Sequence, residues 1–269
     1  MTERTAALLR WYRRTHRPFP WRATTDPYSI LVSEVMLQQT QAGRVVPVYE
    51  RFLERFPTAV SLAAAPLRDV LAAWQGLGYP VRARRLREAA SMVAAGGWPR
   101  TAADLRHLPG VGPYTAAAVA SFAFGQQVAA LDTNARRVLS RWHGAALSGA
   151  ELAGAAAAEV PRDAAAWNQA VMELGATVCR PRSPRCEECP VADRCADPTI
   201  YVPPPRQPAF AGSLRQVRGA VLRTVTSRPG VTVGELAEST GLDHARVSEA
   251  VEGLVRDGLV ALDPAGKVS

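Results

Sequence analysis

Apolar residues recur every three or four positions through most of the chain, which is the spacing of one face of an α-helix. This pattern predicts a series of helices, separated by loops in which proline and glycine concentrate. The predicted helices are Glu3–His16, Tyr28–Gln41, Gly43–Arg55, Leu67–Trp74, Arg82–Ala95, Ala102–His107, Tyr114–Ala123, Thr133–Trp142, Gly149–Ala157 and Ala164–Ala176. Alternating, strand-like positions are scarce until the last few residues, so the sequence predicts an all-α protein.

The pattern changes towards the C-terminus. Residues 197–212, DPTIYVPPPRQPAFAG, are rich in proline and lack periodicity, which predicts a linker that runs over a surface. An amphipathic helix at Leu214–Ser227 follows, then two helices across a short turn, then a small hairpin that turns at Asp263–Gly266. This order is typical of a winged helix. We therefore predict a helical domain over residues 1–196, the linker, and a winged-helix-like module over residues 213–269.

Charge is distributed unevenly along the chain. The net charge is +8, and the whole excess lies in residues 1–212, because residues 213–269 are neutral overall. Such an excess suits a polyanion such as nucleic acid, although an arginine-rich proteome gives the same balance. The last predicted helix of residues 213–269 would expose a mixed, partly acidic face, which favours docking or packing over DNA binding.

Several function classes are disfavoured. No apolar run is long enough to span a bilayer, and the N-terminus lacks the charged, apolar and small-residue order of a secretory signal. We therefore expect a cytoplasmic, nucleoid-associated protein with no membrane partner. The chain has a single lysine, Lys267, so covalent lysine chemistry is nearly excluded.

The four cysteines lie within seventeen residues and are spaced C-x6-C-x2-C-x5-C. They are Cys179, Cys186, Cys189 and Cys195. Thiols clustered in this way in a cytosolic protein indicate a metal centre rather than disulfides, and thiolates suit zinc or iron–sulfur. Arg180, Arg182 and Arg185 lie inside the first gap, where they predict a basic loop for phosphate contact or a merely solvated one.

The segment LPGVGPYTAA, residues 108–117, combines a glycine-rich turn with the start of a helix. Gly110 and Gly112 permit tight or left-handed backbone, and Leu108 and Val111 would anchor the turn in the core. Backbone N–H groups at the start of the following helix are donors for a phosphate. The same pattern also fits an ordinary helix–helix turn.

Two carboxylates stand out as candidates for chemistry. Glu34 would share a helical face with Gln38 and Gln41 among apolar neighbours, a setting that raises a carboxyl pKa for general-acid work; a solvated surface residue is the ordinary alternative. Asp132 stands just before a helical run, where its plain interpretation is an N-cap.

Four segments resemble the MutY branch of the helix-hairpin-helix DNA glycosylases. They are RPFPWR, SEVMLQQTQ, WQGLGYPVRARRL and LPGVGPYTAAAV, and the resemblance runs in order from about residue 5 to residue 200. The cysteine spacing likewise matches the iron–sulfur loop of the endonuclease III and MutY glycosylases. The resemblance implies a two-lobed all-α fold with one [4Fe-4S] cluster on the four cysteines. It also implies a monomer that binds double-stranded DNA with a mismatched or damaged base pair.

The resemblance also implies a mechanism. Glu34 would protonate a flipped adenine, with N7 as the expected position, and Asp132 with Asn134 would stabilise the resulting sugar cation. Tyr114 stands where bifunctional members carry a lysine, so a monofunctional glycosylase that uses water is expected. The residues assigned to DNA contact are Arg22, Gln38, Gln39, Tyr79, Leu108, Gly110, Val111, Gly112, Thr115, Arg180, Arg182 and Arg185.

Two departures from the family leave alternatives open. Pro80 replaces a second aromatic residue after Tyr79, which stiffens the loop that enters the base stack. The segment after the linker is too short for the Nudix-like domain with which many members recognise 8-oxoguanine. Adenine opposite 8-oxoguanine or guanine is the expected target. A thymine or uracil mismatch glycosylase, and a non-catalytic DNA-binding protein on the same scaffold, are the alternatives.

Overall fold

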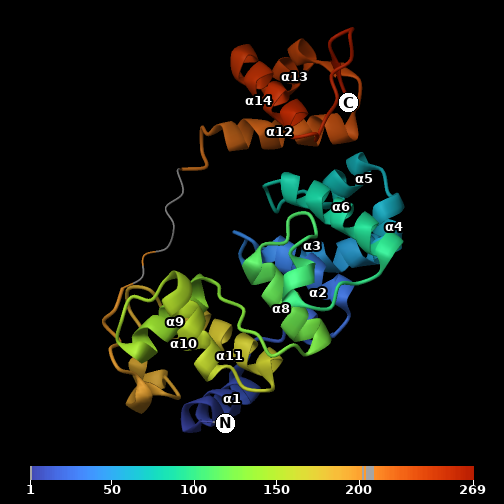
Figure 1. The fold of residues 1–269 in the computed structure, drawn as a ribbon. Coiled ribbons are helices and arrows are strands. Elements are labelled where there is room, and N and C mark those ends of the chain that lie inside the picture. The colour runs from blue at the N-terminus through green and yellow to red at the C-terminus, as the bar shows by residue number, and fades with distance from the viewer. Residues whose placement is uncertain (1, 202, 204–208) are drawn as a thin grey trace. The chain divides into compact units, whose positions relative to one another are not determined.

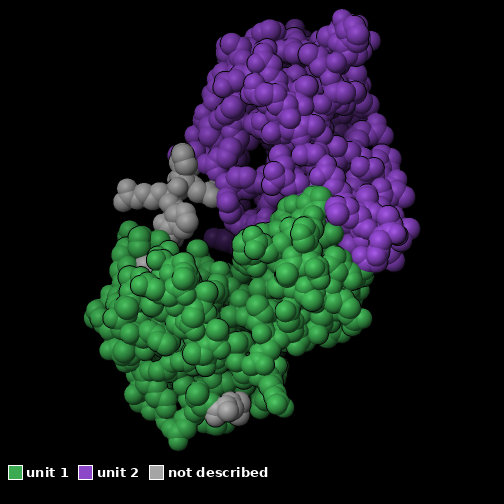
Figure 2. Space-filling view, in the orientation of Figure 1, with its two compact units in different colours: residues 1–35, 98–205 green, residues 36–97, 206–269 purple. Residues whose placement is uncertain are grey.

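The chain folds into two compact units, each built from two separate stretches of sequence. The structure, a computed structural model, describes residues 2–201, 203 and 209–269, so residues 202 and 204–208 of the predicted linker lie outside it. One unit holds residues 1–35 and 98–205, and the other holds residues 36–97 and 206–269 (Figure 2). Helices dominate both units, which confirms the all-α class. Among the described residues, no helix is both long and apolar enough to cross a membrane.

The first unit contains the glycine-rich turn and the helices on both sides of it (Figure 1). Its elements are α1 (Glu3–Thr15), η1 (Pro20–Arg22), most of α2 (Pro27–Leu37), α7 (Ala102–Leu105), α8 (Pro113–Phe124), α9 (Thr133–His143), α10 (Gly149–Glu159), α11 (Ala164–Thr177), η2 (Cys186–Glu188) and η3 (Ala192–Arg194). Helix α11 packs against α1, α8 and α9. It is therefore the central support of this unit.

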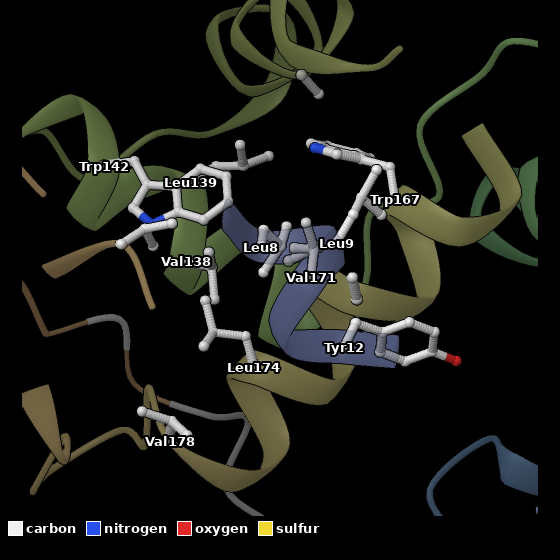
Figure 3. Close-up of a cluster of buried hydrophobic side chains, with 14 of the residues drawn as sticks. Leu8, Leu9, Tyr12, Val138, Leu139, Trp142, Trp167, Val171, Leu174 and Val178 are labelled. Atoms are coloured by element: carbon white, nitrogen blue, oxygen red, sulfur yellow. The ribbon is translucent and has the colours of Figure 1, made fainter. Parts of the chain in front are cut away.

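The core of the first unit lies where α1, α9 and α11 meet (Figure 3). On α11, Trp167, Val171 and Leu174 are buried at positions i, i+4 and i+7, which places them on one helical face. Leu8 of α1 and Leu139 of α9 are fully buried against the same cluster. Full burial of side chains of this size contributes about 1.5–3 kcal/mol each. The core thus fixes the N-terminus of α9, where Asp132 lies.

The second unit combines an internal four-helix segment with the C-terminal module (Figure 1). Its elements are α3 (Ala42–Arg55), α4 (Ala59–Ala64), α5 (Leu67–Ala73), α6 (Val81–Gly96), α12 (Leu214–Ser227), β1 (Val231–Thr232), α13 (Val233–Thr240), α14 (His244–Arg256) and β2 (Lys267–Val268). The sequence pattern predicts a loop where α4 lies. A reciprocal capping box between Thr58 and Ser61 starts this helix instead, and Leu62 is fully buried.

The C-terminal module has the winged-helix order predicted for it. Helices α12, α13 and α14 pack on one another, and β1 pairs with β2 antiparallel. The hairpin turns where expected, because the N–H of Gly266 donates to the carbonyl of Asp263 at 3.0 Å. Helix α12 also packs against α5, so residues 206–269 form one unit with residues 36–97.

Candidate active site

Asp132 is the N-cap of α9. Its carboxylate accepts a hydrogen bond from the N–H of Ala135 at 2.6 Å and one from Asn134 Nδ2 at 2.8 Å. Burial raises the pKa of Asp132 above its ordinary value, while these two bonds and the charge of Arg137 act in the opposite direction. The carboxylate is therefore held rigidly, with its charged form supported by three neighbours.

Glu34 lies on α2, which is buried on almost every side. Its side chain is 4% exposed, and Oε2 accepts no hydrogen bond from the described residues. Burial raises the pKa of Glu34 to about 7, a hydrogen bond from Tyr114 lowers it, and the nearby charge of Asp132 raises it again. A buried carboxyl oxygen without a partner is costly unless a ligand atom meets it, so this oxygen marks a binding position.

Tyr114 joins the two carboxylates. It lies in the first turn of α8 and forms a hydrogen bond with Glu34. The charges of Glu34 and Asp132 both raise the pKa of its phenol. Its hydroxyl oxygen also lies 3.8 Å from Met172 Sδ. Burial and the two carboxylates hold the pKa of the phenol well above its ordinary value, so Tyr114 remains a neutral donor. The structure therefore brings three of the four predicted catalytic side chains into one electrostatic group.

Asn134, the fourth predicted catalytic residue, connects Asp132 to the cysteine loop. Its amide nitrogen donates to Asp132, and its amide oxygen accepts from Arg137 Nη2 at 2.8 Å. Arg137 is 4% exposed, and its Nε donates to the carbonyl of Cys179 at 2.8 Å. A continuous chain of hydrogen bonds thus runs from the carboxylate to the first cysteine.

Sequence reasoning did not identify this role of Arg137. Arg141, one turn later, was missed as well; it is 2% exposed and donates to Cys179 Sγ at 3.1 Å and to the carbonyl of Arg180 at 2.8 Å. The sequence feature that could have identified both buried arginines is their spacing along α9. Two arginines four residues apart share a helical face with apolar core positions, which surface arginines seldom do.

Gly175 of α11 allows α9 to approach closely. A Cβ atom at this position would lie 2.6 Å from Asn134 Cβ and 3.2 Å from its Cα. We expect Gly175→Ala to lower the melting temperature by about 3–10 °C, because the backbone beside Asn134 must shift and such overpacking costs about 1–3 kcal/mol. The matched control is Gly154→Ala on α10, where a Cβ meets nothing within 4 Å. Thermal unfolding that is equal for the two variants would contradict the close approach.

The four cysteines line one cavity, together with Arg141 and Trp142. Burial and the neighbouring cysteines raise the pKa of the Cys189 thiol to about 11, with an opposing backbone hydrogen bond at Val191. None of the described His, Cys, Asp and Glu side chains gather in threes closely enough to hold a single metal ion. The donor set itself, four thiols around a cavity, fits an iron–sulfur group, since bound metal deprotonates its thiol ligands.

The glycine-rich turn has the geometry that its sequence predicts. Leu108 and Val111 are buried, Gly110 has a φ of 78°, and the N–H of Val111 donates to the carbonyl of Leu108 at 3.1 Å. Gly112 is the N-cap of α8, and this end of the helix receives no side-chain cap from the described residues. The N-terminus of α8 is thus suited to bind a phosphate. Thr115, also predicted to contact DNA, is 2% exposed.

The other predicted DNA contacts are placed in different settings. Arg22 pairs with the buried Glu173 at 2.7 Å, although the resemblance assigns its guanidinium to DNA. Arg180 and Arg182 are exposed. Arg185 donates to the carbonyl of Thr177 at 2.8 Å and pairs with Glu188. These arginines remain predictions as DNA contacts, and Arg22 has a structural partner as well.

Gln38, Gln39 and Tyr79 lie in two loops of the second unit. The helix predicted to continue to Gln41 ends at Leu37, so the expected helical face of Glu34, Gln38 and Gln41 does not form. Gln39 has a φ of 57° and Tyr79 a φ of 48°. A positive φ is uncommon outside glycine, and in a bulky side chain it is an outlier that surrounding structure must impose.

Arg82 imposes this geometry, and sequence reasoning missed it. Its guanidinium donates to the carbonyl oxygens of Met36 and Gln38 in one loop, and of Leu77 and Gly78 in the other. Burial lowers the pKa of Arg82 to about 10. One side chain therefore fastens the two loops to each other. The run of arginines in VRARRL does not indicate which one turns inward.

Three protein-family models match the chain in separate regions. A model described as HhH-GPD superfamily base excision DNA repair protein matches residues 32–159. The iron-sulfur binding domain of endonuclease III matches residues 179–195, and a MarR family model matches residues 215–267. The first covers the glycine-rich turn, and the second covers all four cysteines.

Similar proteins extend over most of the chain. An adenine DNA glycosylase of Mycobacterium tuberculosis is 43% identical over an alignment 277 positions long, gaps included, that covers 94% of this chain and 88% of that protein. The adenine DNA glycosylase of Homo sapiens is 44% identical over an alignment 208 positions long, gaps included, that covers 70% of this chain and 38% of that protein.

Solved structures show the same fold. A thermostable thymine-DNA glycosylase superposes with a TM-score of 0.67 at 33% identity, covering 71% of this chain and 93% of that one. Endonuclease III in a non-covalent complex with DNA superposes with a TM-score of 0.63 at 25% identity, covering 74% of this chain and 97% of that one.

Proposed function

The chain belongs to the adenine DNA glycosylases of the HhH-GPD superfamily of base excision repair proteins, and we propose that it hydrolyses the N-glycosidic bond of adenine paired with 8-oxoguanine or guanine. The observation that carries the proposal is the buried Glu34 carboxyl, which has an unpartnered oxygen and a pKa near neutrality beside Asp132. The binding partner is double-stranded DNA, and the protein acts as a monomer.

Glu34 acts as the general acid. A carboxyl with a pKa of about 7 carries its proton on a large fraction of molecules at neutral pH and can still give it up readily. Oε2 has no hydrogen-bond partner among the described residues, so it is available to a nitrogen of the flipped base. Protonation of the purine makes it a better leaving group, and the glycosidic bond then breaks towards an oxocarbenium ion.

Asp132 stabilises that cation. Its environment differs from that of Glu34, because Ala135, Asn134 and Arg137 all support its charged form. Burial raises the pKa of both carboxyl groups, but hydrogen bonds and an arginine charge oppose the rise only at Asp132 to this extent, and such a difference can divide acid and electrostatic roles. Water then adds to the sugar carbon, and one of the two carboxylates takes its proton.

Tyr114 limits the reaction to hydrolysis. Its phenol stays protonated and cannot form the covalent imine that an amine nucleophile would form with the sugar. The cationic side chains of residues 1–212 are arginines, apart from histidine, and arginines do not form Schiff bases. The protein therefore releases the base and leaves the DNA strand intact.

The cysteine loop holds one [4Fe-4S] cluster in this proposal. Cys179, Cys186, Cys189 and Cys195 would bind it, and when bound it supplies a cross-link among four thiolates that orders the loop. Arg137 and Arg141 of α9 already hydrogen-bond to Cys179 in this loop. An ordered loop therefore also stabilises the helix that Asp132 caps.

We expect the purified protein to be brown and to contain about four iron atoms and four sulfides per chain. The measurement is visible absorption combined with iron, sulfide and zinc analysis. Cys186→Ser should lose the colour and lower the melting temperature, because the loop loses its cross-link. A colourless protein that holds a single zinc ion would overturn the cluster assignment.

The function is tested by single-turnover reactions on four duplexes that contain A·8-oxoguanine, A·G, T·G or U·G. Alkali is added to half of each sample to reveal abasic sites. We expect adenine release to be fastest opposite 8-oxoguanine, with strand breaks only after alkali. Release of thymine or uracil would instead assign the activity named for the superposed thymine-DNA glycosylase. Binding without release of any base would identify a non-catalytic protein.

A further inference from the structure

The loop that carries Tyr79 is held in an unfavourable backbone conformation. Gly76, Gly78 and Tyr79 all have positive φ, of 93°, 70° and 48°. The two glycines adopt this region freely, whereas the tyrosine does so at a cost. Arg82 fixes the loop from the side of α6 through the carbonyl oxygens of Leu77 and Gly78. The tyrosine ring itself needs a further support, because it emerges from the strained position.

The C-terminal module supplies that support. Arg215, in the first turn of α12, donates from Nη1 to the hydroxyl oxygen of Tyr79 at 3.0 Å. Tyr79 and Arg215 are both half-buried. The guanidinium of Arg82 lies 5.5 Å from the centre of the same ring. Tyr79 is therefore held at its hydroxyl by one arginine and at its ring by another.

Two further contacts place the module along the whole loop. Gln75, the residue before the first glycine, donates from Nε2 to Thr226 Oγ1 at 2.9 Å. A Cβ on Gly258 would lie 3.8 Å from Arg84 Cδ, so the end of α14 approaches α6 just after the loop. The module thus hydrogen-bonds to residues before and within the loop and lies close to Arg84 after it, while α12 packs against α5.

The charges of the module point to the same role. Residues 213–269 carry no net charge, and Glu249 and Glu252 are on the helix that a winged helix would present to DNA. A phosphate backbone is a poor partner for such a face. In contrast, the side of the module on which Arg215 and Thr226 lie makes specific hydrogen bonds to the loop.

We propose that Arg215 is a positioning residue for Tyr79, and that residues 213–269 act as a brace for the loop Gly76–Pro80 rather than as a separate DNA-reading domain. The inference rests on the proposed function, because the position of Tyr79 matters only if this loop enters the base stack. By fixing the hydroxyl, Arg215 keeps the ring ready for insertion and reduces the ordering that DNA binding requires.

A double-mutant cycle tests the proposal. The variants are Tyr79→Phe, Arg215→Met, the double variant, and Arg223→Met as a control that removes an exposed arginine from the same helix. The probe is a duplex with a 2′-fluoro-adenosine opposite 8-oxoguanine and a 2-aminopurine beside the 8-oxoguanine. The fluorine resists cleavage of the glycosidic bond, so binding and unstacking are read without base release.

We expect Arg215→Met and Tyr79→Phe each to weaken binding about 3–10-fold and to reduce the 2-aminopurine signal. The double variant should bind the duplex no more weakly than either single variant, because both substitutions remove the same hydrogen bond between Arg215 and Tyr79. Arg223→Met should match the wild type, and Arg215→Lys should recover part of the loss. Melting temperatures of all variants establish that they fold.

Two results would overturn the brace. One is an Arg215→Met variant that binds like Arg223→Met while Tyr79→Phe is impaired. The other is a double variant whose loss is the product of the two single losses, which means that the residues act independently. Failure of the proposed function is a separate result: the wild type would release no adenine from the matched duplex without fluorine, whatever the outcome of the cycle.

Discussion

Asp132→Asn is expected to reduce the rate of adenine release by at least about 10³-fold while the protein stays folded. The carboxylate supplies the negative charge that stabilises the sugar cation, and a neutral amide cannot replace it. Asparagine is as good an N-cap as aspartate, so its side-chain oxygen can keep the bond from the N–H of Ala135. Single-turnover kinetics under saturating enzyme measure the loss.

The stability of the Asp132→Asn variant should differ little from that of the wild type, because two effects oppose each other. Burial raises the folded pKa of Asp132 above its unfolded value, so the folded state binds the proton more tightly and loses stability as pH rises through that interval. The neutral asparagine removes this cost, although it gives up the bond from Asn134. We expect a melting temperature within about 5 °C of the wild type.

The matched control is Asp163→Asn, which makes the same change at the N-cap of α11. Asp163 is exposed and accepts from the N–H of Ala166 at 3.3 Å. We expect this variant to release adenine at the wild-type rate. If Asp132→Asn lost DNA binding and base release in equal measure, its role would be structural and the assignment to catalysis would be wrong.

The sequence predicts most closely the helices whose boundaries depend on local signals. The helix Leu214–Ser227 has both ends as predicted, because Ser213 caps it and its apolar residues are periodic. The predicted C-terminus of α2 is four residues too late. Its end depends on Arg82, which is more than forty residues away and takes the carbonyl oxygens of Met36 and Gln38. Such a long-range hydrogen bond leaves no periodic trace in the sequence.

In the candidate site, too, the sequence predicts some features, and others depend on long-range contacts. Residue type and resemblance identify Glu34, Asp132 and Tyr114, and the structure places them in one group. Residue type and resemblance do not identify the arginines that support these three residues, because a buried arginine is recognised only through the carbonyl groups that surround it. Arg137 binds the carbonyls of Cys179 and Gly175, and only the folded chain brings these to α9.

Glu173 illustrates how the surroundings of two buried glutamates lead to opposite pKa shifts. It is 1% exposed, yet hydrogen bonds and charges from Arg17 and Arg22 lower its pKa, against the effect of burial. Glu34, with one hydrogen bond from a neutral phenol, keeps the raised pKa that burial produces. The charge of Arg22 acts on Glu34 as well, so what distinguishes Glu173 is its direct ion pairs with Arg17 and Arg22.

Glu34→Gln is expected to reduce adenine release by about 10²–10⁴-fold, which is the usual contribution of a general acid. In the wild type the rate should be level at low pH and fall about tenfold per pH unit above about 7, because only the protonated carboxyl can donate. The measurement is the single-turnover rate between pH 5 and pH 9. A rate that does not fall above pH 7, or a Glu34→Gln variant that keeps its activity, would exclude Glu34 as the acid.

The same substitution should stabilise the protein, which separates loss of chemistry from loss of fold. The folded pKa of about 7 lies above the ordinary value of 4.5, so the folded state loses stability as pH rises from about 4.5 to 7, and the full cost is present above pH 7. The neutral glutamine of the variant carries no such cost, and at pH 8 we expect a gain on the order of 3 kcal/mol.

Glu173→Gln is a control in which the stability should change in the opposite direction. In the wild type, ion pairs with Arg17 and Arg22 stabilise the charged Glu173 and lower its pKa, and the substitution removes these ion pairs. Chemical unfolding at pH 5 and pH 8 should show the Glu34→Gln gain at pH 8 and little of it at pH 5, with a loss for Glu173→Gln. A Glu34→Gln protein less stable than the wild type at pH 8 would mean that the buried carboxylate is compensated in the fold and is not poised to release a proton.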